Sequence, residues 1–354
     1  MPELRFPGFE GTWEAKFIKN VLQIGSGKDY KHLDEGNIPV YGTGGLMNHV
    51  NDFLYDGESV CIGRKGTIDK PNFIVGKFWT VDTLFYTHSF NNVIPFFMFL
   101  IAQKINWKKY NEASGVPSLS KSTIEKIAIV IPTLPEQQKI ASFFTTIDKK
   151  IELLKKKHSL LEQYKKGVMQ KIFAQEIRFK DENGKKYPDW EEKKLGEVSL
   201  KKSSNISANT ITDNNGDYLI YGAAGVLKSV DFYNEEDRYI SIVKDGAGVG
   251  RVLRCESKTS VLGTLDIIKN KKSNLDFLFY LLLQVRFYKY ITGSTIPHIY
   301  YKDYSKEKVT IPCIQEQTKI ANFLSAIDKK IEKVQLQIDK AEEWKKGLLG
   351  RMFC

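Results

Sequence analysis

Residues 136–152 read EQQKIASFFTTIDKKIE, and residues 316–332 read EQTKIANFLSAIDKKIE, with an offset of 180 at every identical position. Over the longer segments 136–174 and 316–354, 17 of 39 positions are identical without a gap. Self-similarity at one fixed spacing indicates an internal repeat. We therefore expect this chain of 354 residues to consist of two copies of one unit.

The similarity extends towards the start of each half with lower identity. The offset of 180 still relates SGVP at 114–117 to STIP at 294–297, and YGTGG at 41–45 to YGAAG at 221–225. Further back the offset drifts, so that Arg5-Phe6 corresponds to Arg178-Phe179 and Trp13-Glu14 to Trp190-Glu191. Each half is thus predicted to be a divergent body followed by a well-matched tail. Two similar bodies suggest two similar binding events.

The two tails are predicted to be long helices. Pro135 suits a first helical turn, and Glu136 suits the positive end of the helix dipole. Apolar residues recur at steps of 3, 4 or 7, and the positions expected to pair the helices or to dock partner subunits are Ile140, Phe143, Ile147, Ile151, Leu154, Leu161, Ile320, Phe323, Ile327, Ile331, Val334 and Ile338. An antiparallel pair buries both apolar edges, and about 35 helical residues span roughly 50 Å. The alternative is that each helix packs on its own body.

Some features of the tails do not fit a purely structural zipper. His158, Lys165 and Lys345 interrupt the apolar stripe, although a zipper usually avoids charged residues there.

Composition fits a folded protein with an anionic partner. Apolar residues make up 42% of the chain, enough for packed cores. The formal net charge is +11, of which +5 lies in residues 1–177 and +6 in residues 178–354. Charge alone is as compatible with an ordinary basic protein as with a nucleic-acid binder. Its even spread is expected if both halves do the same work.

Cysteine usage and the apolar segments predict a soluble, cytoplasmic protein. The four cysteines form no C-x-x-C pair, and none lies near a histidine at ligand spacing, so no zinc site is expected. The N-terminus has no apolar signal core, and the most apolar stretch, residues 94–105, is too short to span a bilayer.

Each body contains an apolar strand that runs into a basic glycine turn. The residues singled out are Arg64, Lys65 and Gly66 in the first body and Lys244, Gly246 and Arg251 in the second. Such a turn can present backbone N–H groups and cations to a phosphate. It can equally be a tight hairpin with solvated charges. Its recurrence slightly favours a functional role.

An apolar helix with a basic, aromatic end follows in each body, at 96–110 and 277–290. This mixture can stack on bases, but it is more often an amphipathic helix with lysines reaching to solvent. A polar loop comes next. The DNA-binding candidates in the two loops are Ser118, Lys121, His298, Tyr300, Tyr301 and Lys302. These residues differ between the halves, as expected of surfaces that read different bases.

No catalytic motif is evident. The segment GSGK at 25–28 lacks the spacing of a phosphate-binding P-loop, and neither G-x-S-x-G nor H-E-x-x-H occurs. The sequence therefore favours a binding protein with no catalytic and no metal-ligating residues.

These motifs together resemble those of a known protein family. A chain that opens with ELRFPGF and Trp13-Glu14, and that twice carries Ile-Pro followed by EQ-x-KIA and IDKKIE in a long helix, resembles the specificity subunits of type I restriction-modification enzymes. The resemblance covers essentially the whole chain.

The resemblance implies a mixed α/β (α+β) fold of two target recognition domains joined by two long antiparallel coiled-coil helices, with pseudo-twofold symmetry. The expected segments are target recognition domains at 1–134 and 176–313, and conserved spacer helices at 135–175 and 314–354. Each domain would read one half of a bipartite double-stranded DNA site, in major grooves about one turn, roughly 34 Å, apart.

The resemblance also implies partners. Two methyltransferase subunits would dock on the chain, bring S-adenosylmethionine and methylate an adenine flipped out of each half-site. Restriction subunits would add ATP-driven translocation, with ATP and Mg²⁺ bound on the partners. The chain itself would bind no cofactor and no membrane.

Two other classes of function stay open from the residues alone. A stand-alone DNA-binding repressor or architectural protein would bind its site without a methyltransferase. A fused methyltransferase or nuclease would bind S-adenosylmethionine itself or cleave DNA.

Overall fold

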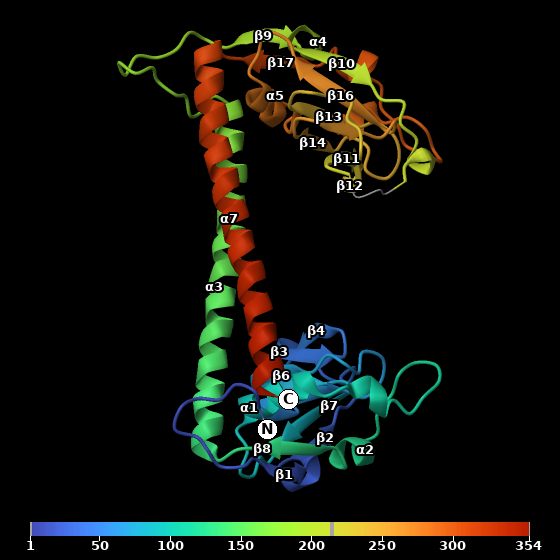
Figure 1. Ribbon diagram of the computed structural model, residues 1–354, viewed down its shortest axis with the longest axis vertical. Coiled ribbons are helices and arrows are strands. Elements are labelled where there is room, and N and C mark those ends of the chain that lie inside the picture. Colours follow the sequence, from blue (N-terminus) through green and yellow to red (C-terminus); the bar gives the residue numbers. More distant parts are fainter. Residues whose placement is uncertain (1, 213–215, 354) are drawn as a thin grey trace. The chain divides into compact units, whose positions relative to one another are not determined.

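The computed structural model describes residues 2–212 and 216–353 and divides the chain into two compact units. The first unit comprises residues 1–157 and 335–354, and the second comprises residues 158–334. Each unit therefore contains one body and one half of each long helix, α3 (Leu134–Phe173) and α7 (Ile314–Met352), as labelled in Figure 1. Residues 1, 213–215 and 354, which fall within the predicted segments 1–134, 176–313 and 314–354, lie outside the described residues.

The first body is built on a six-stranded sheet in the order β2-β7-β5-β6-β3-β4. Its neighbours pair antiparallel, except that β3 and β6 are parallel. Strands β1 and β8 form a separate antiparallel pair that leads into α3. The elements are β1 (Glu14–Phe17), β2 (Gln23–Ser26), β3 (Glu35–Gly42), β4 (Gly45–Val50), β5 (Tyr55–Gly63), β6 (Asn72–Thr80), β7 (Leu84–His88), α1 (Pro95–Lys104), α2 (Lys121–Glu125) and β8 (Ala128–Ile131), with 3₁₀ turns η1 (Ile18–Asn20) and η2 (Trp107–Tyr110).

The second body repeats this plan with the sheet split in two. A four-stranded sheet runs β10-β16-β13-β14, a three-stranded sheet runs β12-β11-β15 with β11 and β15 parallel, and β9 pairs with β17. The elements are β9 (Glu191–Lys194), α4 (Leu195–Val198), β10 (Ser199–Ser203), β11 (Tyr218–Gly222), β12 (Gly225–Val230), β13 (Tyr239–Val243), β14 (Val252–Cys255), β15 (Thr259–Val261), β16 (Leu265–Asn270), α5 (Leu275–Leu282), α6 (Tyr301–Tyr304) and β17 (Lys308–Ile311), with 3₁₀ turns η3 (Ala208–Thr210) and η4 (Phe287–Tyr290).

The long helices pack both on a body and on each other. In the first unit, Ile140, Phe144 and Ile147 of α3 share one core with the body and with Leu349 and Met352 of α7. In the second unit the corresponding core forms from the body, α7 and the end of α3; its buried helix members are Ile320, Ala321, Leu324, Ile327 and Ile172. The two packing modes predicted as alternatives therefore coexist, because the first half of each helix packs on one body together with the second half of the other helix.

The positions predicted to pair the helices are buried to different degrees. Ile140, Ile147, Ile151, Ile320, Ile327, Val334 and Ile338 are buried, whereas Phe143, Leu154, Leu161, Phe323 and Ile331 are half-buried.

The charged residues that interrupt the apolar stripe form matching ion pairs. Asp148 of α3 binds Lys345 of α7 in the first unit, and Lys165 of α3 binds Asp328 of α7 in the second. The residues of these pairs are related by the offset of 180. In the first unit Lys155 also meets Glu342 at 2.6 Å, so residue numbers rise along one helix as they fall along the other. The helices are antiparallel, as predicted.

The repeated Glu-Gln dipeptide ties each body to the start of its helix. Glu136 is 1% exposed and accepts two hydrogen bonds from Arg5, at 2.6 and 2.7 Å, and one from the Trp13 indole at 3.4 Å. The neighbouring Gln137 accepts a bond from the Ile94 backbone N–H at 2.9 Å. A buried carboxylate needs such charge-assisted partners. The motif that identifies the repeat is therefore a structural joint.

The second unit contains the same joint. Glu316 accepts hydrogen bonds from Arg178 at 2.8 Å and from the Trp190 indole at 3.2 Å, and Gln317 accepts one from the Asn274 backbone N–H at 2.9 Å. This explains why the Arg, Trp and Glu-Gln positions recur in both halves of the sequence.

Candidate nucleic-acid interface

In the first body the glycine turn and the polar loop are joined by backbone hydrogen bonds. The turn follows β5, where the Arg64 N–H donates to the Thr83 carbonyl at 2.8 Å. The Gly66 N–H donates to the Pro117 carbonyl at 2.8 Å, and the Leu119 N–H donates to the Arg64 carbonyl at 2.9 Å. Two segments singled out separately in the sequence thus form one surface.

The second body has the same arrangement of a glycine turn and a polar loop joined by backbone hydrogen bonds, which we call the frame. The Lys244 N–H donates to the Thr264 carbonyl, the Gly246 N–H to the Pro297 carbonyl and the Ile299 N–H to the Lys244 carbonyl, each at 2.9 Å. Gly66 has a φ of 93° and Gly246 a φ of 89°. A side chain is strained in this left-handed region, so both turns require glycine.

The cation at the first position of the frame is held differently in the two bodies. The Arg64 guanidinium lies over the Phe85 ring at 5.8 Å and donates to the Asp82 carbonyl at 3.3 Å. The Lys244 ammonium lies 3.5 Å from the carboxylate of Asp266, a residue only 2% exposed. Burial raises the pKa of the Asp266 carboxyl above its ordinary value, although Lys244 opposes that rise.

The other candidates of the first body are Lys65, Ser118 and Lys121. Lys65 is exposed, and its backbone bridges to Ser118 across the joined turn and loop. Lys121 begins α2 and faces Glu125 at 3.8 Å. The equivalent of Lys65 in the second body is Asp245, which bridges to His298.

The loop of the second body is more aromatic. The rings of His298 and Tyr300 meet edge to face at 4.9 Å, and the Lys302 ammonium lies 5.2 Å from the Tyr300 ring. Tyr300 is exposed, so this stack faces solvent. Tyr301 differs, because its hydroxyl donates to the Ser199 carbonyl at 2.9 Å and its ring packs against the body's core.

A third element, the hairpin tip, lies close to each frame. Arg251 donates to the Ala223 carbonyl at 2.6 Å, in the turn between β11 and β12. At the equivalent place of the first body, a Cβ placed on Gly66 would lie 3.5 Å from Thr43 Oγ1, in the turn between β3 and β4. The hairpin tips were not among the predicted site residues. The repeated Tyr-Gly-x-x-Gly segments at 41–45 and 221–225 were the available signal.

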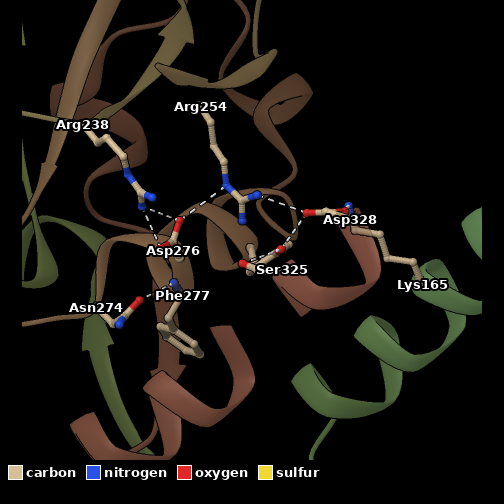
Figure 2. A network of polar contacts seen from close by, with 9 residues as sticks. Lys165, Arg238, Arg254, Asn274, Asp276, Phe277, Ser325 and Asp328 are labelled. Carbon is tan, nitrogen blue, oxygen red and sulfur yellow. Dashed lines mark hydrogen bonds and ion pairs between the residues drawn. The ribbon is translucent and has the colours of Figure 1, made fainter. Parts of the chain in front are cut away.

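A charged network joins the second body to the long helices (Figure 2). Arg254 of β14 donates to Asp328 of α7 at 3.1 Å. Tyr280 of α5 donates to the same carboxylate at 2.6 Å. Lys165 of α3 also binds Asp328. On the other side, Asp276 accepts two hydrogen bonds from Arg238 at 2.8 Å. This network connects four elements, β14 and α5 of the body and the long helices α3 and α7.

The electrostatics of the network follow from its burial. The side chain of Arg254 lies over the Phe279 ring at 4.1 Å, and its buried Nε and Nη2 have no hydrogen-bond partner among the described residues. Burial and the bond to Asp328 raise the pKa of Tyr280 to about 12. No sequence signal pointed to Arg254, because the first half has no arginine at the matching position.

The chain matches a known protein family. The family model described as type I restriction modification DNA specificity domain matches twice, at residues 10–163 and 187–341. The chain belongs to this family. Each matched range contains one frame of turn and loop, so each copy of the specificity domain carries one candidate surface.

Relatives agree with the family assignment. The chain is 25% identical to the type I restriction enzyme MjaVIII specificity subunit of Methanocaldococcus jannaschii, over 87% of this chain and 79% of that protein. It is 26% identical to the putative type I restriction enzyme MjaX specificity subunit of the same organism, over 94% and 83%.

A solved structure supports the predicted fold of this specificity-family chain. The S subunit of the type I restriction-modification system from M. genitalium matches with a TM-score of 0.73 and 16% identity, over 100% of this chain and 99% of that chain. The predicted architecture of two repeated mixed domains with two long helices is confirmed. None of the helices within residues 2–212 and 216–353 is long and apolar enough to span a membrane.

Proposed function

We propose that the chain is the DNA-sequence specificity subunit of a type I restriction-modification system, and that each body recognises one half of a bipartite double-stranded DNA site. The observation that carries the proposal is the frame of turn and loop, which has the same backbone hydrogen bonds in both bodies. On this frame the side chains differ. Base edges are distinguished by specific donors and acceptors, so one scaffold with different side chains suits two different half-sites.

Charge at the two surfaces supports a duplex as the ligand. Arg64 and Lys65 are exposed in the first body, and Arg251 and Lys302 in the second. Phosphate contacts position a protein on DNA, and exposed cations at each frame fit that role.

The long helices are proposed to dock two modification subunits. Trp344 in the first unit and Tyr164 in the second are related by the offset of 180, and they are 53% and 55% exposed. Half-exposed aromatic side chains are common anchors of protein interfaces. Two equivalent anchors suit two copies of one partner. Restriction subunits would join this assembly.

The chemistry is proposed to reside in the partner subunits, which would bring S-adenosylmethionine, ATP and Mg²⁺. The modification subunits would methylate one adenine in each half-site. The state of two cysteines supports a non-catalytic chain, because burial raises the pKa of the Cys61 and Cys255 thiols to about 12 and leaves them poor nucleophiles. We expect the assembly to act on DNA in the cytoplasm.

The decisive experiment is a map of methylated adenines in host DNA, made with the modification subunits alone and with the chain added. The proposal expects one two-part sequence to become methylated only when the chain is present. Site-specific DNA binding by the chain alone, at full affinity, would instead favour a repressor. Binding of S-adenosylmethionine by the isolated chain would favour a fused methyltransferase.

A chimaera and an insertion variant test which part of the chain determines each half-site and which determines the spacer. Exchange of residues 176–313 for the second body of another family member should change one half of the methylated sequence and leave the other half unchanged. Insertion of one heptad in each long helix should lengthen the unread spacer between the halves and leave both halves unchanged. An unchanged spacer contradicts the proposed ruler function of the helices.

A further inference from the structure

Each hairpin tip exposes two large apolar side chains beside the glycine turn. They are Leu46 and Met47 at the start of β4, and Val226 and Leu227 at the start of β12. Their exposed fractions lie between 47% and 57%. The pairs are related by the offset of 180, and both follow a glycine with positive φ, Gly45 or Gly225.

The two hairpins share their backbone geometry as well. Gly42 pairs with Gly45 and Gly222 with Gly225, and each hairpin has a register shift just before the tip, at Tyr41 and Tyr221. A bulge of this kind re-aims the residues that follow it. The same backbone geometry therefore presents two apolar side chains at the hairpin tip in both bodies.

A third exposed apolar residue lies in the loop that is bonded to each turn. Val116 and Ile296 are 56% and 63% exposed, and they precede the prolines whose carbonyls accept hydrogen bonds from Gly66 and Gly246. In each body, the basic glycine turn is thus flanked by an apolar hairpin tip and an apolar loop residue.

The pattern of difference between the bodies separates two roles. Residues that read bases must differ when the two half-sites differ, as Lys65 and Asp245 or Ser118 and His298 do. Residues that do the same physical work at both half-sites can stay alike. Leu46 and Val226, Met47 and Leu227, and Val116 and Ile296 retain apolar character, although water exposure gives apolar side chains no stabilisation.

We infer that Leu46 and Met47 in the first body, and Val226 and Leu227 in the second, are wedges that enter a step between neighbouring base pairs and unstack it. This inference rests on the proposed function and adds a deformation of the DNA to it. The exposed cations Arg64 and Lys65, and Arg251 in the second body, hold the adjacent phosphates. Apolar side chains inserted between base pairs are a known means of kinking a duplex, and the unstacked step buries their surface.

The test uses the chain assembled with its modification subunits and duplexes of the mapped methylation site. In these duplexes 2-aminopurine replaces one base at a time, outside the methylated adenine. The wild-type complex should raise 2-aminopurine fluorescence at one step in each half-site. Leu46→Ser/Met47→Ser should abolish the signal in one half-site only, and Val226→Ser/Leu227→Ser in the other.

Affinity provides a second readout. Each double variant should bind about tenfold or more weakly, which corresponds to part of the free energy of unstacking one step. The slope of log Kd against log salt should stay unchanged, because no cation is lost, whereas Lys65→Ala should lower that slope. A duplex with an abasic position at the affected step should restore the variant's affinity to within about threefold of wild type, because the step is already unstacked.

Two control variants are compared with the serine variants. Val75→Ser replaces another exposed apolar residue of the first body, 64% exposed on β6, and should change neither fluorescence nor affinity. Leu46→Met/Met47→Leu keeps the apolar surface and should retain both signals. Rescue of the serine variants on the abasic duplex shows that their loss of affinity is not caused by misfolding.

Several results would overturn the inference while leaving the proposed function intact. These are a wild-type complex that binds its site without fluorescence change, serine variants of unchanged affinity, or serine variants that methylate a different sequence. Loss of the modification subunits from the serine variants, with DNA affinity restored by excess subunit, would assign the tips to protein docking. A wild-type complex without any site preference would instead overturn the proposed function itself.

Discussion

The contact between one strand and one helix of the body, β6 with α1 or β14 with α5, is aromatic in the first unit and charged in the second. In the first unit Phe73 of β6 packs against Phe96 and Phe99 of α1, with ring centroids 5.2 and 5.6 Å away. In the second unit Arg254 and Asp276 occupy the positions of Phe73 and Phe96.

The register of the strands establishes this equivalence. Phe73 pairs with Val60, and Arg254 pairs with Ile240, and the two partners are related by the offset of 180. One fold thus accepts either an aromatic cluster or an ion-pair network at the same place. The aromatic contact stabilises its unit by burying apolar surface. The charged contact stabilises its unit only while every charge keeps its partner.

The largest expected difference concerns the two equivalent aspartates. Asp328→Ala removes the partner of Lys165, Arg254 and Tyr280 at a carboxylate 15% exposed, so the second unit should lose about 2–3 kcal/mol of unfolding free energy. Asp148→Ala removes only the more exposed pair with Lys345 and should cost less than about 1 kcal/mol.

Denaturant titration monitored by hydrogen exchange in each unit measures both effects. Equal losses from Asp328→Ala and Asp148→Ala would mean that the charged network adds nothing to the ion pair that both units share.

A second prediction converts the charged contact into the aromatic one. Arg254→Phe should destabilise the second unit by about 1–2 kcal/mol, because it leaves Asp276 and Asp328 with fewer partners. The double variant Arg254→Phe/Asp276→Phe reproduces the pair found in the first unit and should recover part of that loss. A double-mutant cycle by urea denaturation measures the coupling. Strictly additive losses would show that the two contacts are not interchangeable.

A smaller effect is expected beneath the glycine turns, where Asp266 of the second body corresponds to Phe85 of the first. Because burial raises the pKa of the Asp266 carboxyl, the native state holds a proton that the unfolded state releases. Stability should therefore fall as pH rises from the ordinary carboxyl pKa through the raised one, and it should not return above that range.

Asp266→Asn should remove this pH dependence from the second unit. Thermal denaturation of both proteins at a series of pH values between about 4 and 7 checks the prediction. Parallel curves for the variant and the wild type would contradict it. Phe85→Leu in the first body serves as a control, because no titrating group is changed there.

The smallest effect is expected at the surface of the helix pair. Lys155 and Glu342 meet at 2.6 Å, but they are 58% and 48% exposed. Glu342→Ala should change the unfolding free energy by less than about 0.5 kcal/mol and should have no effect at high salt. A loss comparable to that of Asp328→Ala would show that the helix pair depends on its surface charges.

Much of this architecture was predictable because its signals are local or periodic. The recurrence of EQ-x-KIA and IDKKIE at an offset of 180 determined the duplication, and the steps of 3 and 4 determined two long helices. The glycine turns were also visible, since a residue that must adopt a positive φ leaves its mark on the sequence at one position.

The role of the most diagnostic residues was not predictable from the same signals. Glu136 was expected to favour the helix dipole, yet its carboxylate is buried between Arg5 and Trp13, more than 120 residues away along the chain. Lys165 and Lys345, which interrupt the apolar stripe of the helices, pair with aspartates of the other helix. Neither partner can be inferred from spacing along one segment.

The sequence by itself determined the repeat, the helical tails and the family, because these depend on residues close together or on one constant offset. Only the tertiary structure decided which segments meet. Backbone hydrogen bonds joined the turn and the polar loop into one surface in each body, and packing placed Arg254 where the first unit has Phe73. Such contacts join residues far apart in the chain, and composition and periodicity carry no record of them.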